Sequence, residues 1–134
     1  MTTKTYNGSC HCQRVKYQAD LDLAGETTRC NCTWCAKTRA WGLNTKPAAF
    51  RLLEGEEVLG SYSKSGFIQH RFCTRCGVQV FATGDIPQIG GAFVGVVLST
   101  LDDAEPAALA ATPIRYCNGR DNLWQDPPRE TRYL

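Results

Sequence analysis

The sequence predicts an all-β fold with irregular loops and little helix. Short segments of alternating or continuous apolar residues recur between Gly-, Ser- and Asn-containing turns, as the strands of a small sheet protein do. Helical composition is confined to residues 102–111, where Pro106 limits any helix to one or two turns. The 134 residues contain no repeat and no Pro/Gly-rich linker, so we expect one domain over residues 1–134.

The first two expected strands lie in the N-terminal half. Residues 14–19 alternate polar and apolar side chains, which is typical of a strand with one buried face. Residues 50–53 are mostly apolar and lead into the turn Glu54-Gly55-Glu56. Both segments therefore predict strands of a half-buried sheet.

The remaining strands are expected in the second half of the chain. Residues 58–62 and 67–72 flank the turn sequence Ser63-Lys64-Ser65-Gly66 and predict a hairpin. Residues 78–81 form a short apolar segment after a Cys-containing turn, and residues 93–98 read as a fully buried strand.

Charge and hydropathy exclude several classes of partner. A net charge of +2 and a pI of about 8.1 are too weakly basic to predict a nucleic-acid partner. The most apolar run, residues 89–98, contains three glycines and is shorter than the roughly 20 residues of a membrane helix. The first residues lack the apolar run of a secretory signal, so we expect a cytoplasmic protein without a membrane partner. In that reducing compartment, eight cysteines indicate metal ligands or catalytic thiols rather than disulfides.

Seven of the cysteines occur in three short motifs, and their spacing suits metal binding. The motifs are Cys10-His11-Cys12, Cys30-Asn31-Cys32-Thr33-Trp34-Cys35 and Cys73-Thr74-Arg75-Cys76-Gly77, with Cys117 separate. In extended chain, residues i and i+2 point the same way, and a CxxC turn places two sulfurs around one ion. Zinc takes four protein ligands in a closed structural site and three in an open catalytic site. Seven cysteines divide into four and three, which predicts two zinc ions per chain.

Spacing alone leaves two ways of grouping these cysteines. Cys10 and Cys12 can join Cys73 and Cys76, which leaves the middle three as an open site. Alternatively, Cys73 and Cys76 can combine with two of the middle three, which strands the N-terminal pair. A disulfide interpretation is disfavoured because CxC rings are strained. An iron–sulfur interpretation is disfavoured because the spacing matches neither common ferredoxin pattern.

The same motifs resemble those of the glutathione-dependent formaldehyde-activating enzyme family, which includes centromere-protein-V-like proteins. The matching segments are Gly8-Ser9-Cys10-His11-Cys12 with Val15-Lys16-Tyr17, Cys30-Asn31-Cys32-Thr33-Trp34-Cys35-Ala36-Lys37, Phe72-Cys73-Thr74-Arg75-Cys76-Gly77, and the tail from Pro113 to Trp124. The resemblance implies a small twisted β-sheet or sandwich scaffold stapled by zinc. It also implies structural zinc ligands at Cys10, Cys12, Cys73 and Cys76, and active-site zinc ligands at Cys30, Cys32 and Cys35. The chain departs from the family pattern at Gln13, Asn31 and Ala36, where the family often has Gly, His and Arg.

The resemblance also implies an activity: joining glutathione to formaldehyde to make S-hydroxymethylglutathione. We therefore expect a zinc-dependent carbon–sulfur lyase or synthase whose partners are a small-molecule thiol and a small aldehyde, with Cys30, Cys32 and Cys35 at its catalytic centre. The alternative is a zinc-stapled binding module without catalysis.

Other polar and aromatic side chains are weaker candidates. Lys37, Arg39 and Arg75 can meet glutathione's carboxylates, although ordinary surface charge is the simpler interpretation. Trp34 and Trp41 are expected either at the floor of a pocket or in the core. We expect His11 to be exposed and His70 to lie on the surface of a strand. Cys117 is expected to be buried in a tail loop, and Asn118 and Asp121 are expected in a turn.

Overall fold

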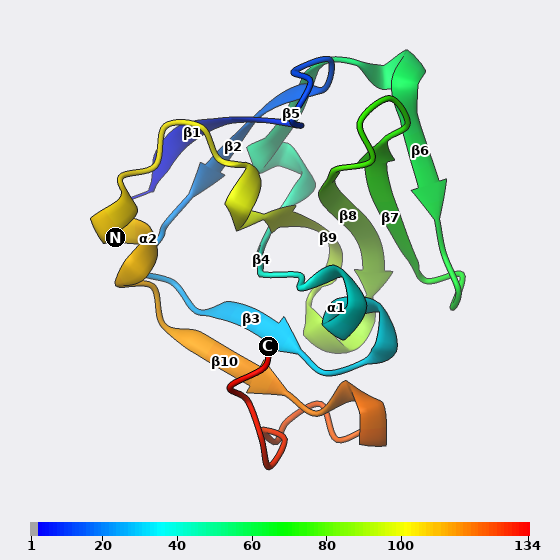
Figure 1. Ribbon diagram of the computed structural model, residues 1–134, viewed down its shortest axis with the longest axis vertical. Coiled ribbons are helices and arrows are strands. Elements are labelled where there is room, and N and C mark those ends of the chain that lie inside the picture. Colours follow the sequence, from blue (N-terminus) through cyan, green and yellow to red (C-terminus); the bar gives the residue numbers. More distant parts are fainter. Residues whose placement is uncertain (1–2) are drawn as a thin grey trace.

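The computed structural model describes residues 3–134 and consists mainly of two β-sheets (Figure 1). The smaller sheet is antiparallel, with β1 (Lys4–Ser9), β2 (Lys16–Leu21) and β5 (Phe50–Glu54) side by side in that order. The larger sheet has the order β10 (Ile114–Cys117), β3 (Thr27–Cys30), β4 (Gly42–Thr45), β9 (Gly91–Val97), β8 (Gln79–Ile86), β7 (Ile68–Cys73) and β6 (Leu59–Tyr62). Its pairs are antiparallel except for the edge pair β10–β3, which is parallel.

Helix is scarce in the described residues. The α-helices are α1 (Thr33–Thr38) and α2 (Pro106–Ala110), and the 3₁₀ turns are η1 (Pro47–Ala49), η2 (Glu56–Val58), η3 (Pro87–Ile89), η4 (Leu98–Thr100) and η5 (Gly119–Asp121). No helix between residues 3 and 134 combines the length and the hydropathy that a bilayer crossing requires. The predicted all-β class with little helix is confirmed.

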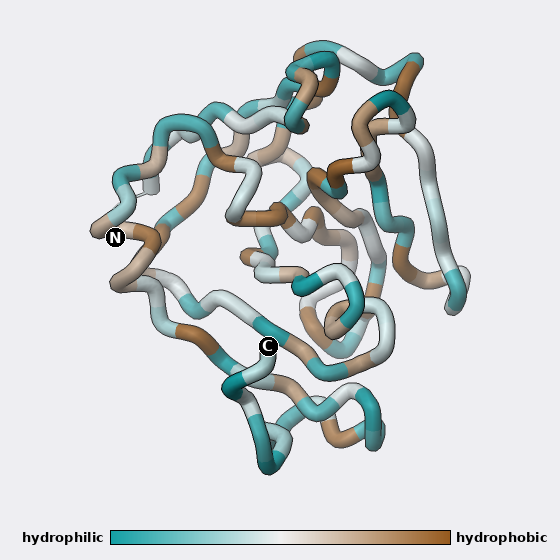
Figure 2. Tube along the Cα trace, in the orientation of Figure 1, coloured by the Kyte–Doolittle hydropathy of each residue, from teal (hydrophilic) through white to brown (hydrophobic). Residues whose placement is uncertain are grey.

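The core lies between the two sheets. Side chains of β2 alternate between half-buried and buried, so Tyr17, Ala19 and Leu21 face inward. Phe50 of the small sheet links the layers, because its ring lies 5.2 Å from that of Tyr17 and 4.6 Å from that of Phe81 in the large sheet. In Figure 2 the hydrophilic segments are prominent in the C-terminal part after β10, whereas apolar residues gather on the central strands.

A buried tyrosine ties the small sheet to η4. The hydroxyl of Tyr17 lies 2.6 Å from that of Thr100, and Thr100 in turn donates to the Val97 carbonyl at 2.7 Å. Burial raises the pKa of Tyr17, since the phenolate would lose its hydration. The hydroxyl therefore acts as a neutral hydrogen-bonding group inside the core.

The predicted elements are mostly present, with shifts at their ends. The hairpin over residues 58–72 is formed by β6 and β7, and the helical segment by α2. The first predicted strand begins two residues later than expected, at Lys16.

The prediction missed α1, β1, β3, β4 and β10. Helix α1 begins inside the middle cysteine motif, where the Cys32 sulfur caps it by accepting from the Cys35 N–H. Helices usually begin at Ser, Thr, Asp or Asn, so a cysteine cap gives no recognisable start in the sequence.

Candidate metal centres

The structure brings four cysteine sulfurs together at one end of the small sheet. Cys10 and Cys12 lie in the turn after β1, Cys73 ends β7 and Cys76 lies in the turn that follows it, and all four Sγ atoms lie within 4.8 Å of one another. The Sγ atoms of Cys10 and Cys12 are 3.6 Å apart, and those of Cys12 and Cys73 are 3.7 Å apart. A tetrahedral zinc with Zn–S bonds of about 2.3 Å has sulfur–sulfur edges of about 3.8 Å. The four thiols therefore fit a closed zinc site.

Two tight turns hold these sulfurs. The Cys10 sulfur accepts from the Val15 N–H at 3.4 Å, and the Cys73 sulfur accepts from the Arg75 N–H at 3.3 Å. Each turn passes through the left-handed region, at Gln13 with φ of 66° and at Gly77 with φ of 79°. A glycine adopts this conformation without strain, whereas any other residue adopts it at a cost of about 1 kcal/mol. Gly77 therefore fits its turn without strain, and Gln13 carries this cost.

The remaining clustered cysteines form a second group of three. Cys30 ends β3, and Cys32 and Cys35 lie at the start of α1, with the three Sγ atoms within 4.8 Å of one another. Backbone N–H groups point at two of the sulfurs: Cys32 N–H donates to Cys30 at 3.3 Å, and Cys35 N–H donates to Cys32 at 3.4 Å. Three thiolate donors on one side suit a metal that keeps a fourth position open.

The three thiols share their protons unequally. Hydrogen bonds from the thiols of Cys32 and Cys35 lower the pKa of Cys30 to about 2, with further donation from the backbone of Cys32 and Gly119. The same sharing raises the pKa of Cys35, which acts as a donor to Cys30 and Cys32. Cys30 is thus the sulfur that carries negative charge most readily.

Residues from the C-terminal part surround this second group. Cys117 ends β10 directly beside Cys30, with which it is paired in the parallel register. Cys117 is buried, as predicted, but it belongs to a strand and not to a tail loop. Asn118 caps the turn η5 by accepting from the Asp121 N–H, which places both residues in a turn as predicted.

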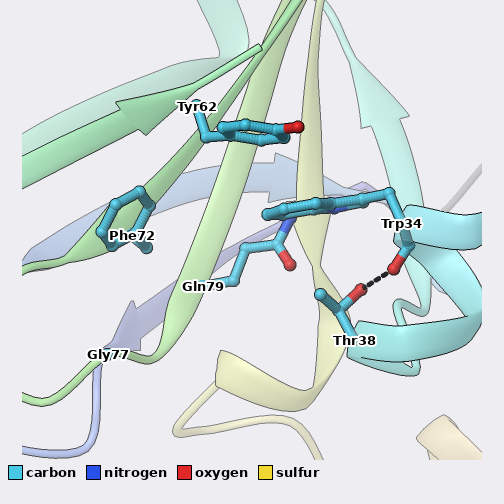
Figure 3. Close-up of a pocket in the computed structure, with 6 residues that line it drawn as sticks. All are labelled: Trp34, Thr38, Tyr62, Phe72, Gly77 and Gln79. Atoms are coloured by element: carbon cyan, nitrogen blue, oxygen red, sulfur yellow. Dashed lines mark hydrogen bonds between the residues drawn. The ribbon is translucent and has the colours of Figure 1, made fainter. Parts of the chain in front are cut away.

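An aromatic stack joins α1 to the β6–β7 hairpin, and Figure 3 shows the rings of Trp34 and Tyr62 in it. The Trp34 ring lies 4.2 Å from that of His70 and 5.1 Å from that of Tyr62, in stacked geometry in both cases. His70 lies on a strand, as predicted, but its side chain is half-buried under the indole, and burial lowers its pKa. Sequence reasoning missed Tyr62, whose contact with Trp34 depends on how the β6–β7 hairpin meets α1.

This stack forms one wall of a groove. A cavity of about 360 Å³ is lined by Trp34, Thr38, Tyr62, Phe72, Gly77 and Gln79. An adjoining cavity of about 330 Å³ shares three of these residues (Thr38, Gly77 and Gln79) and is also lined by Arg39. The indole Nε1 of Trp34 is buried without a hydrogen-bond partner among the described residues. The groove therefore runs along α1, past the turn that follows Cys76.

Of the other predicted candidates, Arg39 lines the adjoining cavity and the rest lie elsewhere. Trp41 packs against the core, and its Nε1 donates to the Thr27 hydroxyl at 3.0 Å while the Arg29 guanidinium lies 5.0 Å from its ring. Arg39 caps α1 and donates to the Tyr133 carbonyl at 3.2 Å. The side chains of His11, Lys37 and Arg75 are exposed.

The fold and the two thiol clusters define a mainly β protein with two sites suited to metal ions. The model of the family "Glutathione-dependent formaldehyde-activating enzyme" matches residues 5–118, and the chain belongs to this family. The family resemblance seen in the cysteine motifs is thereby confirmed.

A solved structure supports the fold. A crystal structure of a Rhodobacter sphaeroides protein superimposes with a TM-score of 0.68 at 24% sequence identity, over 81% of this chain and 99% of that one. At this level of identity the likeness concerns the fold alone.

Proposed function

We propose that this chain is a zinc-dependent carbon–sulfur lyase or synthase acting on a glutathione adduct of formaldehyde or of another small aldehyde. The observation that carries the proposal is the separation of seven thiols into a group of four and a group of three, in a chain of the glutathione-dependent formaldehyde-activating enzyme family. A group of four closes a metal's coordination, whereas a group of three leaves room for a substrate.

The proposal assigns the two groups different tasks and two zinc ions per chain. Cys10, Cys12, Cys73 and Cys76 hold the structural ion and join the turn after β1 to the turn after β7. The catalytic ion is held by the cysteines at the β3–α1 junction, Cys30, Cys32 and Cys35. Zinc at such a site takes a thiol as its fourth ligand and lowers that thiol's pKa.

The reaction forms one carbon–sulfur bond. The sulfur of glutathione attacks the aldehyde carbon, the carbonyl π electrons move to oxygen, and the proton lost by the thiol ends on that oxygen. The reverse reaction breaks the same bond and returns the proton to sulfur.

The chain's own residues orient the substrate. Backbone N–H groups of Cys32 and Cys35 fix the sulfurs of Cys30 and Cys32, which would hold these thiolates in place for a metal ion. The groove beside α1 is proposed to hold the peptide part of the thiol, with Trp34 and Tyr62 excluding water and Arg39 offering a positive charge for a carboxylate. Glutathione and reduced cysteines both belong to the cytoplasm, which is the proposed compartment.

Calorimetry with two ligands tests this function. Glutathione should bind the zinc-loaded protein, and binding should strengthen from about pH 6 to pH 8, since the thiol must lose its proton to coordinate zinc. S-methylglutathione has the same carboxylates but no ionisable thiol, and should bind much more weakly. Equal affinities would contradict coordination through sulfur, and binding of neither ligand would favour the zinc-stapled binding module.

A further inference from the structure

The segment after β10 lies against the three-cysteine group. Strands β10 and β3 run parallel with Cys117 opposite Cys30, so both end at the same level of the sheet. The Asn31 N–H then donates to the Cys117 carbonyl at 3.2 Å, which continues the pairing past the strands. Figure 1 shows the turn after β10 beside the loop that connects β3 to α1.

Gly119 lies close against a sulfur of this group. A Cβ atom built on Gly119 would lie 2.7 Å from the Cys30 Sγ and 2.5 Å from the ring of Trp124. No side chain fits between them, and only a glycine lets the backbone reach the sulfur. The backbone of Gly119 therefore lies directly against the Cys30 sulfur, which also accepts from the Cys32 N–H at 3.3 Å.

A buried pair of amides holds this segment in place. Asn31 Nδ2 donates to Asn118 Oδ1 at 2.9 Å, and Asn31 Oδ1 accepts from the Arg120 N–H at 2.9 Å. Both asparagines are less than a tenth exposed, at 5% and 8%. A carboxylate at position 31 would accept but not donate, so the amide meets both requirements. Asn31 also stands between two of the clustered cysteines, and therefore connects the ligand loop directly to the turn η5.

We infer that residues 117–124 position the three-cysteine metal site, with the Gly119 backbone setting the place of the Cys30 sulfur and the Asn31–Asn118 pair holding that backbone in register. The inference rests on the proposed zinc at Cys30, Cys32 and Cys35. Gly119, Asn31 and Asn118 act through Cys30 and are positioning residues. Contacts that orient a metal ligand in this way are typically worth about 10- to 100-fold in metal affinity.

Two variants test the inference on the full chain. Gly119→Ala forces a methyl group against the Cys30 sulfur, and Asn118→Ala removes the amide without adding bulk. Each should weaken binding of one of the two zinc ions about 10- to 100-fold in a chelator competition, while the other ion keeps its affinity. In cobalt-substituted protein, each should also shift the sulfur-to-cobalt charge-transfer absorption, which a general loss of stability would not do.

The matched control is Gly42→Ala, because a Cβ there would meet only the Val96 carbonyl oxygen at an ordinary 3.7 Å. The inference would be overturned if Asn118→Ala had the same two zinc affinities and the same cobalt spectrum as the unaltered protein. This outcome decides the matter even if Gly119→Ala fails to fold. An unaltered chain that holds a single metal ion would contradict both the inference and the proposed function. A chain that holds two ions but binds no glutathione would contradict the proposed function alone.

Discussion

The two cysteine groups differ in how far apart their members lie in the chain. The group of four joins segments more than 60 residues apart, as the contact between Cys12 and Cys73 shows. The group of three comes from six consecutive residues, 30–35. Metal binding in the first group therefore closes a long loop and fixes two turns of the fold against each other, whereas in the second it organises a local segment. Loss of the two metals should accordingly have different consequences.

The largest expected effect is that of Cys73→Ser. Cys73 is fully buried, and the metal site to which we assign it connects the small sheet with the β7–β8 turn. Structural zinc contributes an apparent ~10–16 kcal/mol to folding in small zinc domains, which exceeds the usual stability of a protein of this size. The variant should fail to give folded protein, as judged by circular dichroism and thermal unfolding. A soluble, cooperatively unfolding Cys73→Ser protein would remove the distinction between the groups.

Cys32→Ser should have a smaller effect on the fold. The site to which we assign Cys32 is local, and β3 is paired with β4 and β10 through backbone hydrogen bonds rather than through the cysteine sulfurs. The variant should stay folded, hold one zinc fewer in native mass spectrometry, and lose glutathione binding. If it unfolds as completely as Cys73→Ser, the division into a closed and an open site is wrong.

The smallest effect concerns the aromatic side of α1. Burial lowers the pKa of His70, so the unfolded state binds a proton more readily than the folded state does. The contribution of His70 to the free energy of unfolding is fully present above the ordinary histidine pKa of about 6.5. This contribution decreases as the pH falls through that value. His70→Phe keeps a ring against Trp34 and should weaken the pH dependence of the unfolding free energy between roughly pH 5 and 7. Denaturant unfolding of zinc-loaded protein measures this, with the exposed His11→Gln as control; identical pH profiles for His70→Phe and the unaltered chain would contradict it.

The sequence predicted the residues of both groups better than it predicted their surroundings. Cysteine spacing within each motif is local, so it shows which thiols share a turn. Which turns meet depends on sheet topology, and for that reason spacing alone left two groupings open. The structure groups the cysteines as the family resemblance implies, with Cys10 and Cys12 beside Cys73 and Cys76.

The contacts around the three-cysteine group could not be predicted. Asn31 and Asn118 are 87 positions apart, and their hydrogen bond depends on a parallel edge strand with little sequence pattern of its own. His70 and Trp34 likewise meet only because the β6–β7 hairpin folds over α1. A short apolar or alternating segment predicts a strand, but it does not show which other strand or helix will lie beside it.

The central claim is that the group of three leaves a coordination position that a thiol takes. X-ray absorption at the zinc edge measures the sulfur ligands directly. Seven cysteine sulfurs around two zinc ions give an average of about 3.5 per ion, and one added thiol raises it to about 4. Glutathione should produce this rise in zinc-loaded protein and S-methylglutathione should not. An unchanged sulfur count in the presence of saturating glutathione would contradict the claim.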